Sequence, residues 1–233
     1  MCVLMSLKLS AQVNPNFSCD DFSFDVSSNT RASVEFLSKK KYLDAIKDSI
    51  PRSQKPIIQE NEILNTEFQK NFPNIITEHC VHSKSFEDGQ IGEISFCSKK
   101  YKMFLVSKEY HFYIFKIQAF EIDGYLVFNS DDKTIYNTDH YPIILDNGKM
   151  ILDIGYRYGG TNIIKYYKFN DKKVDYFELS FPFYNQIKSY NIIKKFDKFK
   201  LAVELIKYNT KETAPNKYED DKNDFCSKLL IIN

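Results

Sequence analysis

Residues 80–97, CVHSKSFEDGQIGEISFC, decide the fold because they predict their own pairing. Asp88-Gly89 is a favoured two-residue hairpin turn, since both central positions of a type I′ turn need a positive φ. With that turn, residues that face each other have numbers that sum to 177. An apolar pair, an opposite-charge pair, a polar pair and a cysteine pair then fall on one face, and such cross-strand pairs stabilise a sheet. These pairs are Phe86/Ile91, Lys84/Glu93, His82/Ser95 and Cys80/Cys97.

The same register predicts a disulfide. Cys80 and Cys97 form a non-hydrogen-bonded pair, in which the Cα atoms lie roughly 4.5 Å apart, and a disulfide can span that distance. Of the other three cysteines, Cys2 lies in an N-terminal segment that we expect to be removed, and we expect Cys19 to pair with Cys226. Two disulfides are typical of an oxidising compartment.

The N-terminal segment, residues 1–12, also indicates export. It combines a short apolar stretch with Ser10-Ala11-Gln12, which is similar to the end of a secretory signal peptide and its cleavage site. Lys8 interrupts the apolar stretch and no basic segment precedes it, so an ordinary cytosolic N-terminus is the alternative. We expect a periplasmic or secreted protein in which residues 13–233 form a single domain.

The apolar pattern changes along that domain. Between residues 30 and 73 apolar side chains recur at helical spacing, with Pro51 ending the first run and Pro73 the second. From 75 to 208 short aromatic and β-branched segments alternate with turn sequences, which is typical of antiparallel strands. Residues 209–233 add a charged loop and a C-terminal segment. The sequence predicts an α+β fold, predominantly antiparallel β, with a small helical N-terminal part. A propeller-like, sandwich or barrel arrangement would each accommodate the strands.

Charge and motifs narrow the function. The 32 Lys and Arg residues balance 31 Asp and Glu, and only three of the 32 are Arg, whereas nucleic-acid-binding proteins usually have a basic, Arg-containing surface. No apolar run approaches the roughly 18 residues of a membrane-spanning helix. His79 and His82 lie on opposite faces of a strand and cannot share a metal ion. The chain has none of the phosphate-binding, dinucleotide-binding or zinc-protease motifs. We therefore expect no nucleic acid, membrane span, metal, cofactor or catalytic residue.

One stretch has a familiar pattern. Residues 146–160, DNGKMILDIGYRYGG, place a turn, a strand with an aspartate, an aromatic pair and two glycines in succession, and IIKYYKF follows at 163–169. About 30 residues thus resemble the FG-GAP-like β-repeats and the related β-rich periplasmic proteins that include lysozyme inhibitors. The resemblance implies recognition of a protein by a loop. Three apolar residues separate Gly148 from Asp153, where the calcium-binding repeats have oxygen ligands at a shorter spacing, so we expect no calcium site.

These observations favour an exported protein that binds another protein, such as an inhibitor or immunity protein against a cell-wall hydrolase or a secreted toxin. The candidate contacts are Tyr156, Arg157, Tyr158, Gly159 and Gly160, because Tyr and Arg are enriched in interface hot spots. Tyr156 and Tyr158 could instead be ordinary strand residues that pack against their neighbours. A carbohydrate- or cell-surface-binding module and a hydrolase with unrecognised catalytic acids are the alternative functions.

Overall fold

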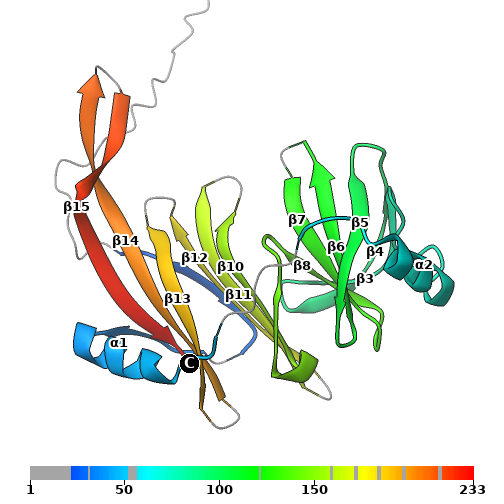
Figure 1. The fold of residues 1–233 in the computed structure, drawn as a ribbon, viewed down its shortest axis with the longest axis horizontal. Coiled ribbons are helices and arrows are strands. Elements are labelled where there is room, and N and C mark those ends of the chain that lie inside the picture. Colours follow the sequence, from blue (N-terminus) through cyan, green and yellow to red (C-terminus); the bar gives the residue numbers. More distant parts are fainter. Residues whose placement is uncertain are drawn as a thin grey trace, which may run out of the picture.

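Three β-sheets dominate the protein, with short helices beside them (Figure 1). The computed structural model describes residues 22–30, 32–51, 57–120, 122–157, 160–170, 173–182, 185–195, 198–214 and 217–233. Almost all strand pairs in these ranges are antiparallel, so the predicted α+β, mostly antiparallel fold is confirmed. None of the helices in the described ranges is long and apolar enough to cross a membrane.

The largest sheet, which we call sheet C, has six strands and contains the predicted hairpin. In spatial order they are β4 (Gln90–Cys97), β3 (Cys80–Glu87), β8 (Thr134–Thr138), β7 (Ile122–Asn129), β6 (Phe112–Ala119) and β5 (Lys102–Glu109). The pair β3 and β8 is parallel, and the other neighbours are antiparallel.

The other two sheets are built mainly from the second half of the chain, and each takes one edge strand from the N-terminal part. Sheet A has the order β1 (Asp25–Ser28), β12 (Lys173–Pro182), β11 (Thr161–Asn170), β10 (Met150–Arg157) and β9 (Ile143–Leu145). Sheet B has the order β13 (Gln186–Lys195), β14 (Lys198–Ala214), β15 (Lys217–Ile232) and β2 (Val34–Leu37).

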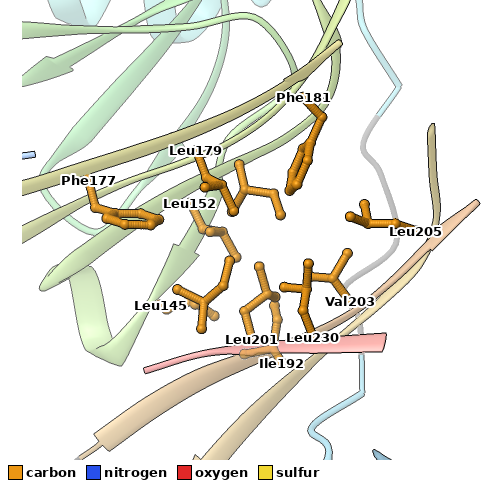
Figure 2. Packing of buried hydrophobic residues seen from close by; sticks show 12 residues of the cluster. Leu145, Leu152, Phe177, Leu179, Phe181, Ile192, Leu201, Val203, Leu205 and Leu230 are labelled. Atoms are coloured by element: carbon orange, nitrogen blue, oxygen red, sulfur yellow. The ribbon is translucent and has the colours of Figure 1, made fainter. Parts of the chain in front are cut away.

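Sheet A is the middle layer, because both of its faces are covered by another sheet. On one face its side chains pack against sheet B in a cluster that includes Leu152, Leu179, Leu201 and Leu230 (Figure 2). Residues of opposite parity on the same strands face the other way. The sheets pack face to face, as in a sandwich, and the strand orders describe open sheets without closure into a barrel.

The second face of sheet A packs against sheet C through an aromatic cluster. Ile151 and Tyr167 from sheet A meet Phe112 and Val127 from sheet C, all four nearly or fully buried. Helix α2 (Glu62–Asn71) covers the outer face of sheet C, where the ring of Phe68 lies 4.8 Å from that of Phe115. The cores therefore stack in the order α2, sheet C, sheet A and sheet B.

Helix α1 (Lys39–Ala45) completes the stack on the outer face of sheet B, where Tyr42 packs against Ala202 and Ile231. A 3₁₀ turn, η1 (Ile46–Asp48), follows it, and a second one, η2 (Asp146–Gly148), joins β9 to β10.

The helical segment differs from the prediction for residues 30–73. Strand β2 occupies Val34–Leu37, because the edge of β15 supplies main-chain partners that helical spacing cannot reveal. Ser38 then ends the strand and caps α1, its Oγ accepting a hydrogen bond from the Lys41 N–H at 3.4 Å. The second helix begins at Glu62, where Asn61 Oδ1 accepts from the Leu64 N–H at 3.0 Å.

The β3–β4 hairpin confirms the register derived from the turn. Cys80 faces Cys97 and Lys84 faces Glu93, and both turn residues have positive φ, 47° at Asp88 and 86° at Gly89. The Cys80–Cys97 disulfide is formed, with the Cα atoms 4.1 Å apart.

The predictions about the two ends of the chain fall partly on residues that the structure does not describe. Cys226 is buried and disulfide-bonded, whereas Cys19 lies outside the described residues, so their pairing stays a prediction. Residues 1–12 also lie outside the described residues. In place of the loop expected over 209–224, β14 runs to Ala214 and β15 begins at Lys217, with most residues between 209 and 221 paired across the two strands. Main-chain pairing with a neighbouring strand needs no apolar side chain, so a charged sequence can form it.

A polar network lies between the strands of sheet B. Glu204 accepts hydrogen bonds from Lys188 Nζ at 2.9 Å, Ser189 Oγ at 3.2 Å and Ser227 Oγ at 3.2 Å. Burial acts to raise the pKa of Glu204, but the hydrogen bonds and the charge of Lys188 outweigh it and hold the pKa below its ordinary value.

Candidate functional site

The predicted binding residues lie at the end of the β10–β11 hairpin. Arg157 faces Thr161 across the two strands, and the Gly160 N–H donates to the Arg157 carbonyl at 3.2 Å to close the turn. Gly160 has a φ of 107°, which favours glycine. Tyr156 presents 56% of its surface to solvent. Tyr158 and Gly159 lie outside the described residues.

Arg157 is half-buried and is bound by two carboxylates. Its Nη1 and Nη2 donate to the two oxygens of Glu178 at 3.0 and 3.2 Å, and its Nε donates to Asp139 Oδ2 at 3.1 Å. Partial burial acts to lower the pKa of Arg157, but these hydrogen bonds and charges outweigh it and raise the pKa above its ordinary value. The guanidinium group of Arg157 therefore binds Glu178 and Asp139 and fixes the position of the β10–β11 hairpin end.

Asp153 is the centre of the same polar cluster and is fully buried. It accepts hydrogen bonds from the backbone N–H groups of Asp139 at 2.7 Å and His140 at 3.1 Å, and it lies 3.7 Å from Lys165 Nζ. Lys165 Nζ is also 3.6 Å from Asp139. Because a buried charge is costly unless it is paired and hydrogen-bonded, these contacts make the buried carboxylate tolerable.

His140 connects this cluster to the strand that carries Tyr156. Its Nδ1 lies 2.9 Å from Asp153 Oδ1 and its Nε2 lies 3.0 Å from the Tyr156 carbonyl oxygen. Both partners are acceptors, so only a ring with protons on both nitrogens donates to both of them. The ring lies directly over Gly155, where an added Cβ would be 2.4 Å from His140 Nε2. Glycine at position 155 is what allows the ring to approach.

The cluster joins two of the three sheets. Asp153, Lys165 and Glu178 face one another on β10, β11 and β12 of sheet A. Asp139 and His140 come directly after β8 of sheet C. Since each charged group has an opposite charge within reach, the arrangement acts as an electrostatic clamp. We use the name clamp for Asp139, His140, Asp153, Arg157, Lys165 and Glu178.

The sequence pointed to Arg157 but missed the rest of the clamp. The structure places Asp153 opposite Lys165 and Lys165 opposite Glu178. The Gly159-Gly160 turn does not reveal this register, because a two-residue turn at the glycine pair would place Asp153 opposite Tyr166. Three alternating charges across three neighbouring strands indicate a buried ionic ladder.

Two possible metal sites can be assessed from their ligand atoms. Cys80, His82 and Cys97 lie close together, and His82 Nε2 is 3.6 Å from Cys97 Sγ. Both sulfurs belong to the disulfide, so neither is a thiolate that could bind a metal. In the DNG-containing stretch, Asp153 accepts hydrogen bonds from two backbone N–H groups and lies 3.7 Å from the ammonium group of Lys165.

No protein-family model, curated protein or solved structure matches the chain. The resemblance to FG-GAP-like repeats and lysozyme inhibitors therefore stays a prediction.

Proposed function

We propose that the protein is an exported recognition protein that binds a protein partner through the end of the β10–β11 hairpin. Its partner class is a secreted or periplasmic enzyme or toxin, which the protein would inhibit or neutralise. The observation that carries the proposal is the exposed Tyr156 ring on a strand end that the clamp holds in place.

Rigidity at the contact residue supports this function. Tyr156 lies between Gly155, which packs under His140, and Arg157, which is bound to two carboxylates. Its own carbonyl is 3.0 Å from His140 Nε2. A contact residue that is already ordered loses less conformational entropy on binding, which favours affinity. An exposed Tyr is a suitable anchor, because it supplies a large apolar area together with a polar hydroxyl.

A second exposed aromatic residue lies on the same edge of the molecule. Phe120, at the β6–β7 turn, exposes 89% of its surface. In Figure 1 the β6–β7 and β10–β11 hairpins both end at the upper edge. A protein partner that covers this edge could contact both aromatic side chains.

Export is part of the proposal and is supported by the Cys80–Cys97 disulfide. Disulfides persist in secreted and periplasmic proteins and are rare in reducing compartments.

The test is a binding and inhibition assay with matched variants. The immobilised protein is exposed to secreted or periplasmic extract, a retained protein is identified and purified, and its hydrolytic or toxic activity is measured with and without this chain. The Tyr156→Ala variant then tests the contact. Truncating an interface anchor costs about 2 kcal/mol, which corresponds to a roughly 30-fold rise in Kd.

Tyr110→Ala is the matched control, because Tyr110 is 57% exposed but lies at the β5–β6 turn. We expect Tyr110→Ala to bind as the unaltered protein does. Equal losses in both variants would contradict a specific role for the β10–β11 hairpin. Failure to retain any partner, or retention without an effect on its activity, would contradict the proposed inhibition.

A further inference from the structure

A cavity of about 720 Å³ lies between sheets A and B, apart from the hairpin end proposed for partner binding. Its apolar lining comes from both sheets and includes Leu152 and Ile164 from sheet A and Leu201 and Ile232 from sheet B. All four are at least nine-tenths buried. The volume lies within the range of roughly 300–1,000 Å³ found for small-molecule sites.

The cavity lies beside the packed cluster that sheets A and B share. Figure 2 shows Leu152 of sheet A approaching Leu201 and Ile192 of sheet B from the opposite side. These three residues belong to the apolar lining, and polar residues of β11 and the start of β14 also line the cavity. It is therefore amphipathic, with one apolar part and one polar part.

Tyr166 stands between the two parts. Its ring stacks on Phe177 with the centroids 5.3 Å apart, and burial, together with the nearby charge of Asp175, raises its pKa above the ordinary value. The hydroxyl thus stays protonated and can donate a hydrogen bond to a ligand.

The charged residues of the lining give the polar part a positive balance. Lys168 is on the same face of β11 as Ile164 and Tyr166, because alternate residues of a strand share a face. Lys198 and Lys200 at the start of β14 also contribute to the lining. Within the described residues none of these three lysines is in an ion pair.

Acidic residues reduce this balance only in part. The described lining contains two carboxylates, Glu35 and Asp175. Asp175 is already neutralised by Lys173, whose Nζ is 2.7 Å from Oδ1, and it accepts from Asn170 Nδ2 at 2.7 Å. Lys168, Lys198 and Lys200 outnumber the remaining carboxylate, Glu35, so the net charge of the polar part is positive.

We propose that this cavity binds a single-chain amphipathic anion, with its hydrocarbon chain between the two sheets and its anionic end beside Lys168. The apolar lining favours the hydrocarbon chain of the ligand, since the transfer of apolar surface from water into an apolar cavity is favourable. The ammonium group of Lys168 selects the anionic end over a neutral or cationic one. The proposed ligand is a free single-chain molecule, such as a fatty acid or an alkyl sulfate.

Because the chain contains no Trp, a single introduced Trp can report ligand binding through its fluorescence. Tyr166→Trp places one indole in the lining of the cavity, and Phe120→Trp places one at the exposed β6–β7 turn, which contributes no lining residue. Each is titrated with monomeric dodecanoate, with dodecanol and with dodecyltrimethylammonium. We expect a saturable blue shift for Tyr166→Trp with dodecanoate, binding of the cation at least about tenfold weaker, and no shift for Phe120→Trp. Calorimetry on the unaltered protein with dodecanoate covers the case that Tyr166→Trp does not fold.

Three further variants test the location and the charge selection. Lys168→Gln should weaken dodecanoate binding about tenfold while leaving dodecanol binding unchanged. Ala32→Phe, which narrows the cavity at a lining residue, should weaken both ligands. Lys99→Gln, an exposed lysine on the β4–β5 turn, should change neither.

Several outcomes would overturn the proposal. They are the absence of saturable binding, equal affinity for the cation and the anion, and an unchanged affinity in both Lys168→Gln and Ala32→Phe. Vesicles of a two-chain anionic phospholipid should give no shift. A shift with vesicles and none with dodecanoate would assign the surface to membrane binding instead. These results do not depend on the protein partner, because Tyr156 is not part of the cavity lining.

Discussion

The approach of His140 to Gly155 gives a sharp test of the clamp. In Gly155→Ala the new Cβ would be 2.4 Å from Nε2 and 2.6 Å from both Cδ2 and Cε1 of His140. Contacts this short do not occur, so the ring must move away. It then loses its contacts to Asp153 Oδ1 and to the Tyr156 carbonyl oxygen.

The expected cost can be worked from these contacts. A hydrogen bond to a charged group contributes roughly 1.5–3 kcal/mol, and Asp153 is fully buried, so its lost partner is not replaced by water. The φ of 155° at Gly155 favours glycine, so an alanine there also carries backbone strain of about 1–3 kcal/mol. We expect Gly155→Ala to lower the free energy of unfolding by about 3–5 kcal/mol. For a protein of this size that corresponds to a fall in Tm of roughly 10–15 °C.

Gly92→Ala is the matched control, because no atom lies within 4 Å of the position its Cβ would occupy. Urea unfolding followed by circular dichroism should give an unchanged midpoint for Gly92→Ala and a lower one for Gly155→Ala. The His140→Ala variant and the double variant Gly155→Ala/His140→Ala complete a double-mutant cycle. The double variant should lose less stability than the two single variants together, because the clash partner is gone and only the backbone strain of alanine at position 155 adds to the loss of His140. Additive losses, or equal midpoints for the two glycine variants, would refute the reasoning.

Three other predictions concern stability. Removing the Cys80–Cys97 disulfide, which spans 17 residues of sequence, should lower the free energy of unfolding in urea by about 3 kcal/mol. Free thiols at these two cysteines, found by peptide mapping under oxidising conditions, would contradict the register of the β3–β4 hairpin. Phe68→Ala should cost about 3–5 kcal/mol, since the ring is fully buried among other aromatic rings, whereas Phe120→Ala at an exposed turn should change stability by less than about 0.5 kcal/mol. Glu204→Gln should be less stable than the unaltered protein above pH 4.5, because the folded-state pKa of Glu204 is lowered. The difference in the free energy of unfolding should shrink as the pH falls below that value. A difference that does not change with pH in urea titrations would argue against the network around Glu204.

Features that depend on strands adjacent in the sequence could be predicted from local sequence. The Asp88-Gly89 turn was enough to place Cys80 opposite Cys97, because a two-residue turn leaves one register. Strand β10 lies in the region 75–208 that was predicted to form strands, since short aliphatic and aromatic segments between turn sequences are a local signal.

Features that depend on distant partners could not be predicted in the same way. Strand β1 (Asp25–Ser28) is exposed along its whole length and exists because β12 offers a free edge. Strand β2 has the apolar spacing of a helix but pairs with β15. The clamp likewise depends on sheets A and C meeting, and no local pattern shows that His140 would lie over Gly155.

The two edge strands from the N-terminal part have a consequence for how the protein is made. Strand β1 joins β12, and β2 joins β15, so each pairing links the beginning of the described chain to its second half. Sheet C, in contrast, is formed by a continuous stretch of the middle of the chain. During synthesis sheet C can therefore form first, whereas sheet A stays incomplete until β12 has been made and sheet B until β15 has been made. Pairings of such high contact order fold slowly. The unpaired edges of β14 and β12 are therefore exposed to other chains until β15 and β1 have joined them.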